Sequence, residues 1–137
     1  VGTIIRSADA AGATAVLLGR GCADPYNPKT VRSTMGSIFH LPVLEVDLRE
    51  ALRQAASRGI RIVSAAPDAP ITMYEADFAK STWILMGSEA HGVSEDLLPL
   101  ASLQVSIPMP GKAESLNVAA AASILLYEAL RQRRFSR

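Results

Sequence analysis

One stretch constrains the fold more than any other, residues 105–128, which read VSIPMPGKAESLNVAAAASILLYE. It begins as a short apolar strand over residues 105–109 and breaks at Pro110-Gly111, a pair that cannot continue a strand. A polar bend over residues 112–115 follows, and then an Ala- and Leu-rich helix with Asn117 in its first turn. Because open α/β sheets bind ligands where strands end and helices begin, we predict that this stretch lies at a binding site.

Short apolar runs alternate with helical patterns along the rest of the chain. Strands are predicted over residues 14–18, 41–46, 60–65, 82–86 and 105–109, and helices over residues 2–11, 29–35, 48–57, 94–100 and 116–134. Residues 67–78 are predicted to form a polar crossover. This alternation predicts an α/β fold, with a parallel sheet covered by helices on both faces, in one domain over residues 1–137.

Composition excludes several classes of protein. With one cysteine, Cys22, the chain has neither a disulfide framework nor a Cys-rich zinc site, and His40 and His91 lack the spacing of metal ligands. No apolar run approaches the roughly 20 residues that span a bilayer. We therefore expect no metal, no membrane and a cytoplasmic setting. Because the chain starts at Val1 without a methionine and directly in a helical pattern, we expect a further segment to precede it.

The net charge of +1 is unevenly distributed. Residues 1–40 carry four basic and two acidic side chains, residues 41–130 carry six basic and eleven acidic ones, and the last seven residues carry four arginines. If the two basic ends meet in space, they form a surface for a polyanion. The alternative for the tail is an ordinary solvated helix end, where arginine is favoured.

Three segments carry a family pattern: GTIIRSADAAG (2–12), ILMGSEAHGVS (84–94) and IPMPGKAESLNV (107–118). Together they resemble the three signature motifs of the SpoU/TrmH-type RNA ribose 2′-O-methyltransferases of the SPOUT superfamily. The segment KTVRSTMG (29–36), followed by Leu41-Pro42-Val43, resembles the stretch between the first two motifs. The third motif is the most specific. Two departures are Ser88, where the family usually has asparagine, and a family asparagine whose position falls just ahead of Val1. The resemblance also implies that a first sheet strand and a substrate-binding extension precede Val1.

The resemblance implies a C-terminal trefoil knot in the sheet and S-adenosylmethionine as the methyl donor. It places the adenine and ribose of that cofactor against backbone groups near Gly87, Ile107, Met109 and Leu116. The residues support this chemistry, because a neutral adenine needs an apolar slot with a few backbone donors and acceptors. The alternative for Ile107 and Leu116 is plain core packing, and we expect them to serve both purposes.

The resemblance also implies that the reacting ribose is surrounded by Arg6, Glu89, Ser115 and Asn117. Each has a simpler alternative. Arg6 has Asp9 and Asp24 as candidate ion-pair partners, and Glu89 is a candidate cap for the helix that follows it. Ser115 is a candidate N-cap of the last helix, with Asn117 as an ordinary first-turn residue.

The leading hypothesis is thus an S-adenosylmethionine-dependent methyltransferase acting on a ribose 2′-hydroxyl of structured RNA, either rRNA or tRNA. The alternatives are a catalytically silent, knotted RNA-binding module, a SPOUT enzyme that methylates a base nitrogen, and, without the family, a flavodoxin-like nucleotide-binding domain. Intact Arg6, Glu89, Ser115 and Asn117 argue against the silent module.

A homodimer is predicted from the last helix. Its apolar residues recur at spacings of three and four, and the stripe is wider than one side of a sheet would cover. The stripe consists of Val118, Ala122, Leu125, Leu126 and Ala129, widened by Ile124 and Leu130. One side of the helix is expected to face the chain's own sheet and the other a second copy, as the resemblance to SPOUT enzymes also implies.

Overall fold

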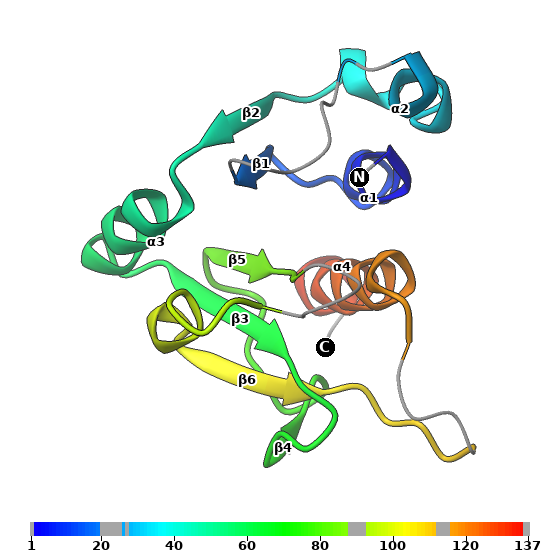
Figure 1. Cartoon of the computed structure of the whole chain (residues 1–137). Helices are drawn as coiled ribbons and strands as arrows, with labels where there is room; N and C mark the ends of the chain where they lie inside the picture. Colours follow the sequence, from blue (N-terminus) through cyan, green and yellow to red (C-terminus); the bar gives the residue numbers. More distant parts are fainter. Residues whose placement is uncertain (1, 20–25, 27, 88–92, 112–115, 136–137) are drawn as a thin grey trace.

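The structure, a computed structural model, describes residues 2–19, 26, 28–87, 93–111 and 116–135. Helices and strands alternate along the chain, as predicted (Figure 1). In order they are α1 (Gly2–Ala10), β1 (Val16–Gly19), α2 (Pro28–Ser33), the 3₁₀ helix η1 (Ser37–Phe39), β2 (Val43–Val46), α3 (Leu48–Ser57), β3 (Arg61–Ala65), β4 (Ile71–Thr72), β5 (Thr82–Leu85), the 3₁₀ helix η2 (Leu98–Leu100), β6 (Leu103–Ser106) and α4 (Val118–Arg134).

All strand pairs are parallel, which confirms the predicted class of sheet. A four-stranded sheet has the order β4-β6-β3-β5, and β1 pairs with β2 in a separate two-stranded sheet. The latest strand, β6, lies between two earlier ones, with Val63 of β3 opposite Leu103 and Ile71 of β4 opposite Val105. Within the described residues, the edges of β1 and β5 that face away from β2 and β3 have no strand partner.

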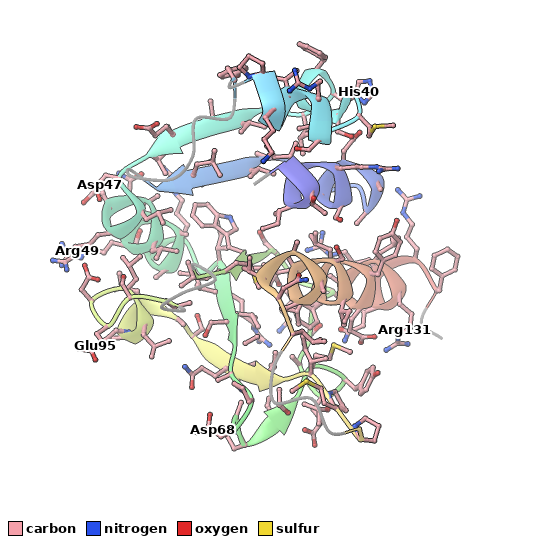
Figure 2. The ribbon with its side chains drawn as sticks, turned by 45° about the vertical axis from the view of Figure 1, so that its right-hand side comes forward. His40, Asp47, Arg49, Asp68, Glu95 and Arg131 are labelled. Atoms are coloured by element: carbon pink, nitrogen blue, oxygen red, sulfur yellow. The ribbon has the colours of Figure 1, made fainter. Side chains whose placement is uncertain are left out.

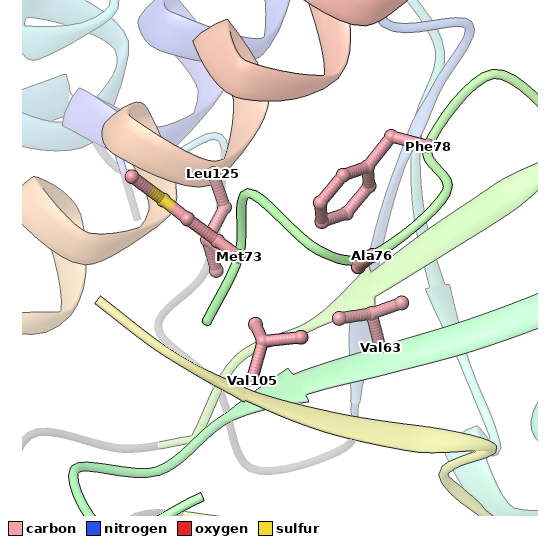
Figure 3. Packing of buried hydrophobic residues seen from close by; sticks show 6 residues of the cluster. All are labelled: Val63, Met73, Ala76, Phe78, Val105 and Leu125. Atoms are coloured by element: carbon pink, nitrogen blue, oxygen red, sulfur yellow. The ribbon is translucent and has the colours of Figure 1, made fainter. Parts of the chain in front are cut away.

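Helices cover both faces of the four-stranded sheet. Neighbouring residues of β3 point to opposite faces, as they must in a strand. On one face, Val63 packs with Leu125 of α4 and with Phe78 of the crossover (Figure 3). On the other face, Ile62 packs with Leu52 and Ala55 of α3. The prediction of a doubly covered sheet is therefore confirmed.

A third cluster joins α1 to the two-stranded sheet. Ile5 and Ala8 of α1 pack with Leu18 and Val43, and Leu126 of α4 packs against the same cluster. Helices α1 and α4 consequently lie side by side (Figure 1). Helix α4 thus contributes to two clusters of its own chain, through the adjacent residues Leu125 and Leu126.

This double packing corrects the interpretation of the apolar stripe on α4. The sequence predicts that a second copy of the chain buries one side of this broad stripe. In the structure, the sheet covers one side of α4, and α1 covers the neighbouring side. Ala122 is only 2% exposed, and Ile124 and Ala129 pack against the cluster around Val63. The width of the stripe therefore does not by itself indicate a dimer.

Local signals place several element ends where the sequence predicts them. Asp47 caps α3, and its Oδ1 accepts a hydrogen bond of 3.4 Å from the backbone N–H of Glu50. Gly59 follows α3 with a φ of +77°, a left-handed conformation that glycine adopts without steric cost. Gly36 likewise ends the turn after α2, with a φ of +88°.

Three details differ from the prediction. β6 stops at Ser106 rather than residue 109, because Pro108 and Pro110 lack the N–H groups that a ladder needs. The helix expected over residues 94–100 is a turn followed by η2, and Ser94 donates to Asp96 Oδ1 (2.7 Å) within that turn. The crossover contains the short strand β4, which exists only because β6 lies beside it.

Candidate functional site

Two predicted cofactor contacts follow neighbouring strands at one edge of the sheet. Gly87 lies two residues after Leu85, the last residue of β5, and Ile107 lies two residues after Val105 of β6. Leu85 pairs with Ser64 of β3 and Val105 with Ala65, so both segments leave the sheet at nearly the same level. They flank the carboxyl end of β3, where parallel sheets bind ligands.

The side chains near this edge are apolar and only half covered. Ile107 packs against the cluster around Val63 and keeps part of its surface exposed. Gly87 and Met109 are also half-buried, and Leu116 is 38% exposed. Strand ends beside half-covered apolar side chains suit a flat, neutral ring. The core packing expected of Ile107 is therefore present, and its exposed remainder leaves the predicted cofactor contact open.

Asn117 is the N-cap of α4. Its Oδ1 accepts a hydrogen bond of 2.8 Å from the backbone N–H of Ala120, and its carbonyl accepts from Ala121. The cap position expected for Ser115 thus belongs to Asn117, while Ser115 itself lies outside the described residues. Within the described part of the chain, only the oxygen of the Asn117 amide is hydrogen-bonded, which leaves its two N–H donors for another partner.

An open hollow of about 470 Å³ lies beside Asn117, between α1 and α4. Thr3 of α1 and Ala119, Ala120 and Ser123 of α4 complete its lining. The hydroxyls of Ser7 and Ser123 share a hydrogen bond of 2.7 Å that joins the two helices. Ser123 donates to the carbonyl of Ala119 (2.9 Å), so the proton between the two serines comes from Ser7.

The sequence analysis missed Thr3, Ser7 and Ser123. A signal was present, because Thr3 and Ser7 are four residues apart and share a face of a helix that otherwise has mostly small and apolar side chains. That polar face points to α4. The structure thereby brings the first and third sequence motifs together at the hollow.

Arg6 is exposed on α1, one turn after Thr3. One of its simpler alternatives fails, because Asp9 is hydrogen-bonded to His40 at 3.0 Å instead. Hydrogen bonds from His40 and Ser37 hold the pKa of Asp9 below its usual value. Within the described part of the chain, no ion pair involves Arg6. The other alternative partner, Asp24, lies outside that part, as does the predicted site residue Glu89.

Three further observations concern the described residues only. No group of three or more His, Cys, Asp or Glu side chains is placed to hold a metal ion. None of the helices is long and apolar enough to cross a membrane. A larger hollow, about 550 Å³ and lined by Pro70, Glu95 and Leu103 among others, lies near the start of β6 and contains none of the predicted site residues.

The sequence and the fold of this chain are both similar to those of known proteins. The model of the SpoU rRNA Methylase family matches residues 1–127. The chain belongs to this family. Within the SpoU family, the 23S rRNA (uridine(2479)-2′-O)-methyltransferase of Streptomyces viridochromogenes is 44% identical over 140 residues, covering 97% of this chain and 48% of that relative.

Another relative and a solved structure are also similar to this chain over nearly its whole length. The 23S rRNA (guanosine(2553)-2′-O)-methyltransferase RlmP of Bacillus subtilis is 42% identical over 127 residues, 93% of this chain and 51% of that relative. The crystal structure of AviRb from S. viridochromogenes in complex with AdoMet has a TM-score of 0.90 and 40% identity, and covers 100% of this chain and 54% of that one. The chain spans about half the length of the curated relatives it matches.

Proposed function

We propose that residues 1–137 form the catalytic domain of an S-adenosylmethionine-dependent RNA methyltransferase that modifies a ribose 2′-hydroxyl. The observation that carries this proposal is the meeting of α1 and the start of α4 at one hollow. Thr3 lines it from α1 and Asn117 from the start of α4, and Arg6 lies one turn after Thr3 on α1. Support comes from the AdoMet complex of AviRb, which the fold matches over the full length of this chain.

The cofactor fits the edge formed by the ends of β5 and β6. Backbone groups near Gly87, Ile107 and Met109, together with Leu116, would hold its adenine and ribose. The half-buried Ile107 and Met109 offer the apolar surface that such a ring needs. When bound, S-adenosylmethionine supplies an electrophilic methyl group. No metal is needed for this chemistry.

Arg6 would stabilise charge at the reacting ribose. The 2′-hydroxyl must lose its proton as it is methylated, and negative charge develops on its oxygen. Arginine keeps its proton at neutral pH, so it is poorly suited as a base. Its planar guanidinium suits an adjacent phosphate and a developing oxyanion. Asn117, through its amide N–H groups, and Glu89 and Ser115 would orient the ribose and Arg6.

The proposed substrate is ribosomal RNA, which would place the protein in the cytoplasm. The names of the two relatives support 23S rRNA, but they specify a uridine in one case and a guanosine in the other. Because these relatives are almost equally similar to this chain, the choice of base does not follow from the shared residues. A reaction at the ribose is consistent with this difference in the base, because all nucleotides of RNA carry the same ribose.

Two features of the complete protein are also proposed. A segment outside residues 1–137 would add a strand between β1 and β5, whose facing edges have no partner among the described strands. The chain after β6 would pass through a loop to form the trefoil knot of the family, and the position of β6 between β3 and β4 supports this. Further residues would then belong to a substrate-binding extension.

The test compares RNA from cells with and without the gene, by mass spectrometry of nucleosides. We expect deletion to remove one 2′-O-methylated nucleoside, and the wild-type gene to restore it. Arg6→Ala should fail to restore it while S-adenosylmethionine affinity, measured by calorimetry, stays within a few-fold. Arg6→Lys should rescue poorly, since a point charge cannot replace the planar fork. Restoration by Arg6→Ala would contradict the assigned role, and binding of ATP instead of S-adenosylmethionine would contradict the proposed function.

A further inference from the structure

The segment formed by α2 and η1, residues 28–40, is here called the α2–η1 elbow. It presents large apolar side chains to solvent, with Phe39 77% exposed and Met35 70% exposed. Tyr26, two residues before α2, is exposed as well. Single exposed apolar side chains are ordinary, but several in one short segment mark an interaction surface.

The backbone of the elbow holds these side chains outward. Met35 has a φ of +52°, which is uncommon for a residue other than glycine, and Gly36 follows with +88°. Thr34, which is fully buried, anchors the turn by donating from Oγ1 to the carbonyl of Val31 (2.7 Å). A strained conformation of this kind persists only where its surroundings impose it, and such residues gather at functional sites.

Arg32, Met35 and Phe39 lie close together on the elbow. The N–H of Met35 donates to the carbonyl of Arg32 (3.2 Å), and the N–H of Phe39 donates to the carbonyl of Gly36 (3.1 Å). The three residues therefore occupy two successive tight turns. All three side chains, which carry a guanidinium, a thioether and an aromatic ring, are exposed within this short segment.

The elbow is also positively charged. Lys29 and Arg32 are exposed, and the sequence has no acidic residue between Asp24 and Glu45. Among the described residues, Asp9 of α1 reaches the elbow, through a hydrogen bond of 3.0 Å with His40. Figure 2 shows His40 at one end of the molecule, well separated from the acidic residues Glu95 and Asp68.

We propose that the α2–η1 elbow binds single-stranded RNA, with Phe39 stacking on an unpaired base and Arg32 contacting the backbone. This inference rests on the proposed function and adds a site and a form of RNA to it. Exposed aromatic rings with neighbouring cations are the usual means of binding unpaired nucleotides. A second copy of the chain is disfavoured, since a two-fold interface through this surface would bring like charges together.

The experiment measures binding of fluorescently labelled oligouridylate, about ten nucleotides long, to the complete protein by anisotropy. Phe39→Ala should weaken binding by about ten-fold, because one stacking platform is lost. Phe39→Trp should retain the affinity, whereas Phe39→Leu should not, since leucine keeps apolar area but has no aromatic face. Arg32→Ala should reduce the slope of log affinity against log salt by about 0.7, and Arg32→Lys should preserve it.

Tyr74→Ala is the matched control, because Tyr74 is an exposed aromatic residue on the crossover, away from the elbow. Equal affinity of Phe39→Ala and Tyr74→Ala, with wild-type protein binding RNA normally, overturns the inference and leaves the proposed function intact. A fall in molecular mass of Phe39→Ala by light scattering also overturns it, in favour of a protein interface. Wild-type protein that binds S-adenosylmethionine but no RNA of any kind overturns both.

Discussion

At the scale of single residues, Asn117 combines a structural and a proposed chemical role in one side chain. Its Oδ1 satisfies the N–H of Ala120 and so fixes the first turn of α4. The same bond fixes the orientation of the amide and thereby the direction of its N–H donors. A cap that is also a donor explains why an amide, rather than a hydroxyl or carboxylate, suits this position.

Substitutions at Asn117 should separate the two roles. Asn117→Asp keeps the accepting oxygen but loses both donors, so we expect normal stability with methylation strongly reduced. Asn117→Ala loses the cap as well and should cost about 1 kcal/mol of unfolding free energy. Urea unfolding followed by Trp83 fluorescence, beside a methylation assay, measures both effects. Full activity of Asn117→Asp would show that Asn117 is a cap only.

At the scale of elements, the C-terminal part of α4 is attached to the segment that leads into β5. Gln132 accepts from the N–H of Phe78 (2.7 Å) and donates to the carbonyl of Ala76 (2.9 Å). It also donates to Glu128 (2.7 Å), a buried carboxylate that receives two hydrogen bonds from Arg131. Polar side chains thus fix the end of α4 opposite to the proposed site.

The pKa of Glu128 is lowered, first by the hydrogen bond from Arg131 and then by that from Gln132, against the effect of burial. Its ionised form therefore favours folding. This stabilisation is fully present above the ordinary pKa of 4.5 and is lost as the pH falls from there through the lowered pKa of the folded state. Glu128→Gln should lower the unfolding free energy by about 1–2 kcal/mol at neutral pH. The difference from wild type should shrink at about pH 4.

Glu50 offers a matched control for this prediction. It is also a helix glutamate with a glutamine four residues later, and its Oε1 accepts from Gln54 (3.1 Å), but it is exposed. Glu50→Gln should change stability by no more than a few tenths of a kcal/mol. If Glu128→Gln lost the same stability at every pH, ionisation of Glu128 would not be the cause.

At the scale of the whole molecule, the predicted homodimer is best tested at a residue on the outer side of α4 rather than at Ala122 of the apolar stripe. Ala122 is buried within its own chain, so a charge there should unfold the protein instead of dissociating a dimer. Tyr127 lies on the outer side of the same helix and is 49% exposed. A second copy of the chain would have to cover that outer side.

Tyr127→Glu should therefore dissociate the dimer without unfolding the chain, because it places a charge only in the proposed interface. Light scattering at micromolar concentration would give the mass of a single chain, while thermal unfolding stays close to that of wild type. Ala122→Glu should show the opposite pattern, with unfolding at a much lower temperature. A wild-type protein with the mass of one chain would rule out the dimer.

Signals that lie within a few residues of each other made much of the fold predictable. Asp47 and Gly59 mark the two ends of α3, and Pro108 explains the end of β6 even though the predicted strand was too long. Contacts between residues far apart in the sequence could not be predicted from such local signals. The bond between Ser7 and Ser123 joins residues 116 positions apart. β4 is a strand only through its pairing with β6, and the burial of Ala122 depends on what covers α4.

Because β6 lies between β3 and β4, the four-stranded sheet cannot be completed until late in translation. The ribosome releases β3, β4 and β5 before β6, so the space opposite Val63 and Ile71 stays vacant until Leu103 and Val105 emerge. Pairing between such distant segments is slow, and apolar surface exposed meanwhile favours aggregation. A ribosome that stalled before residue 103 would release a chain that lacks both β6 and α4. We expect chaperones to bind such a chain and proteases to degrade it, because it cannot form a partly working domain.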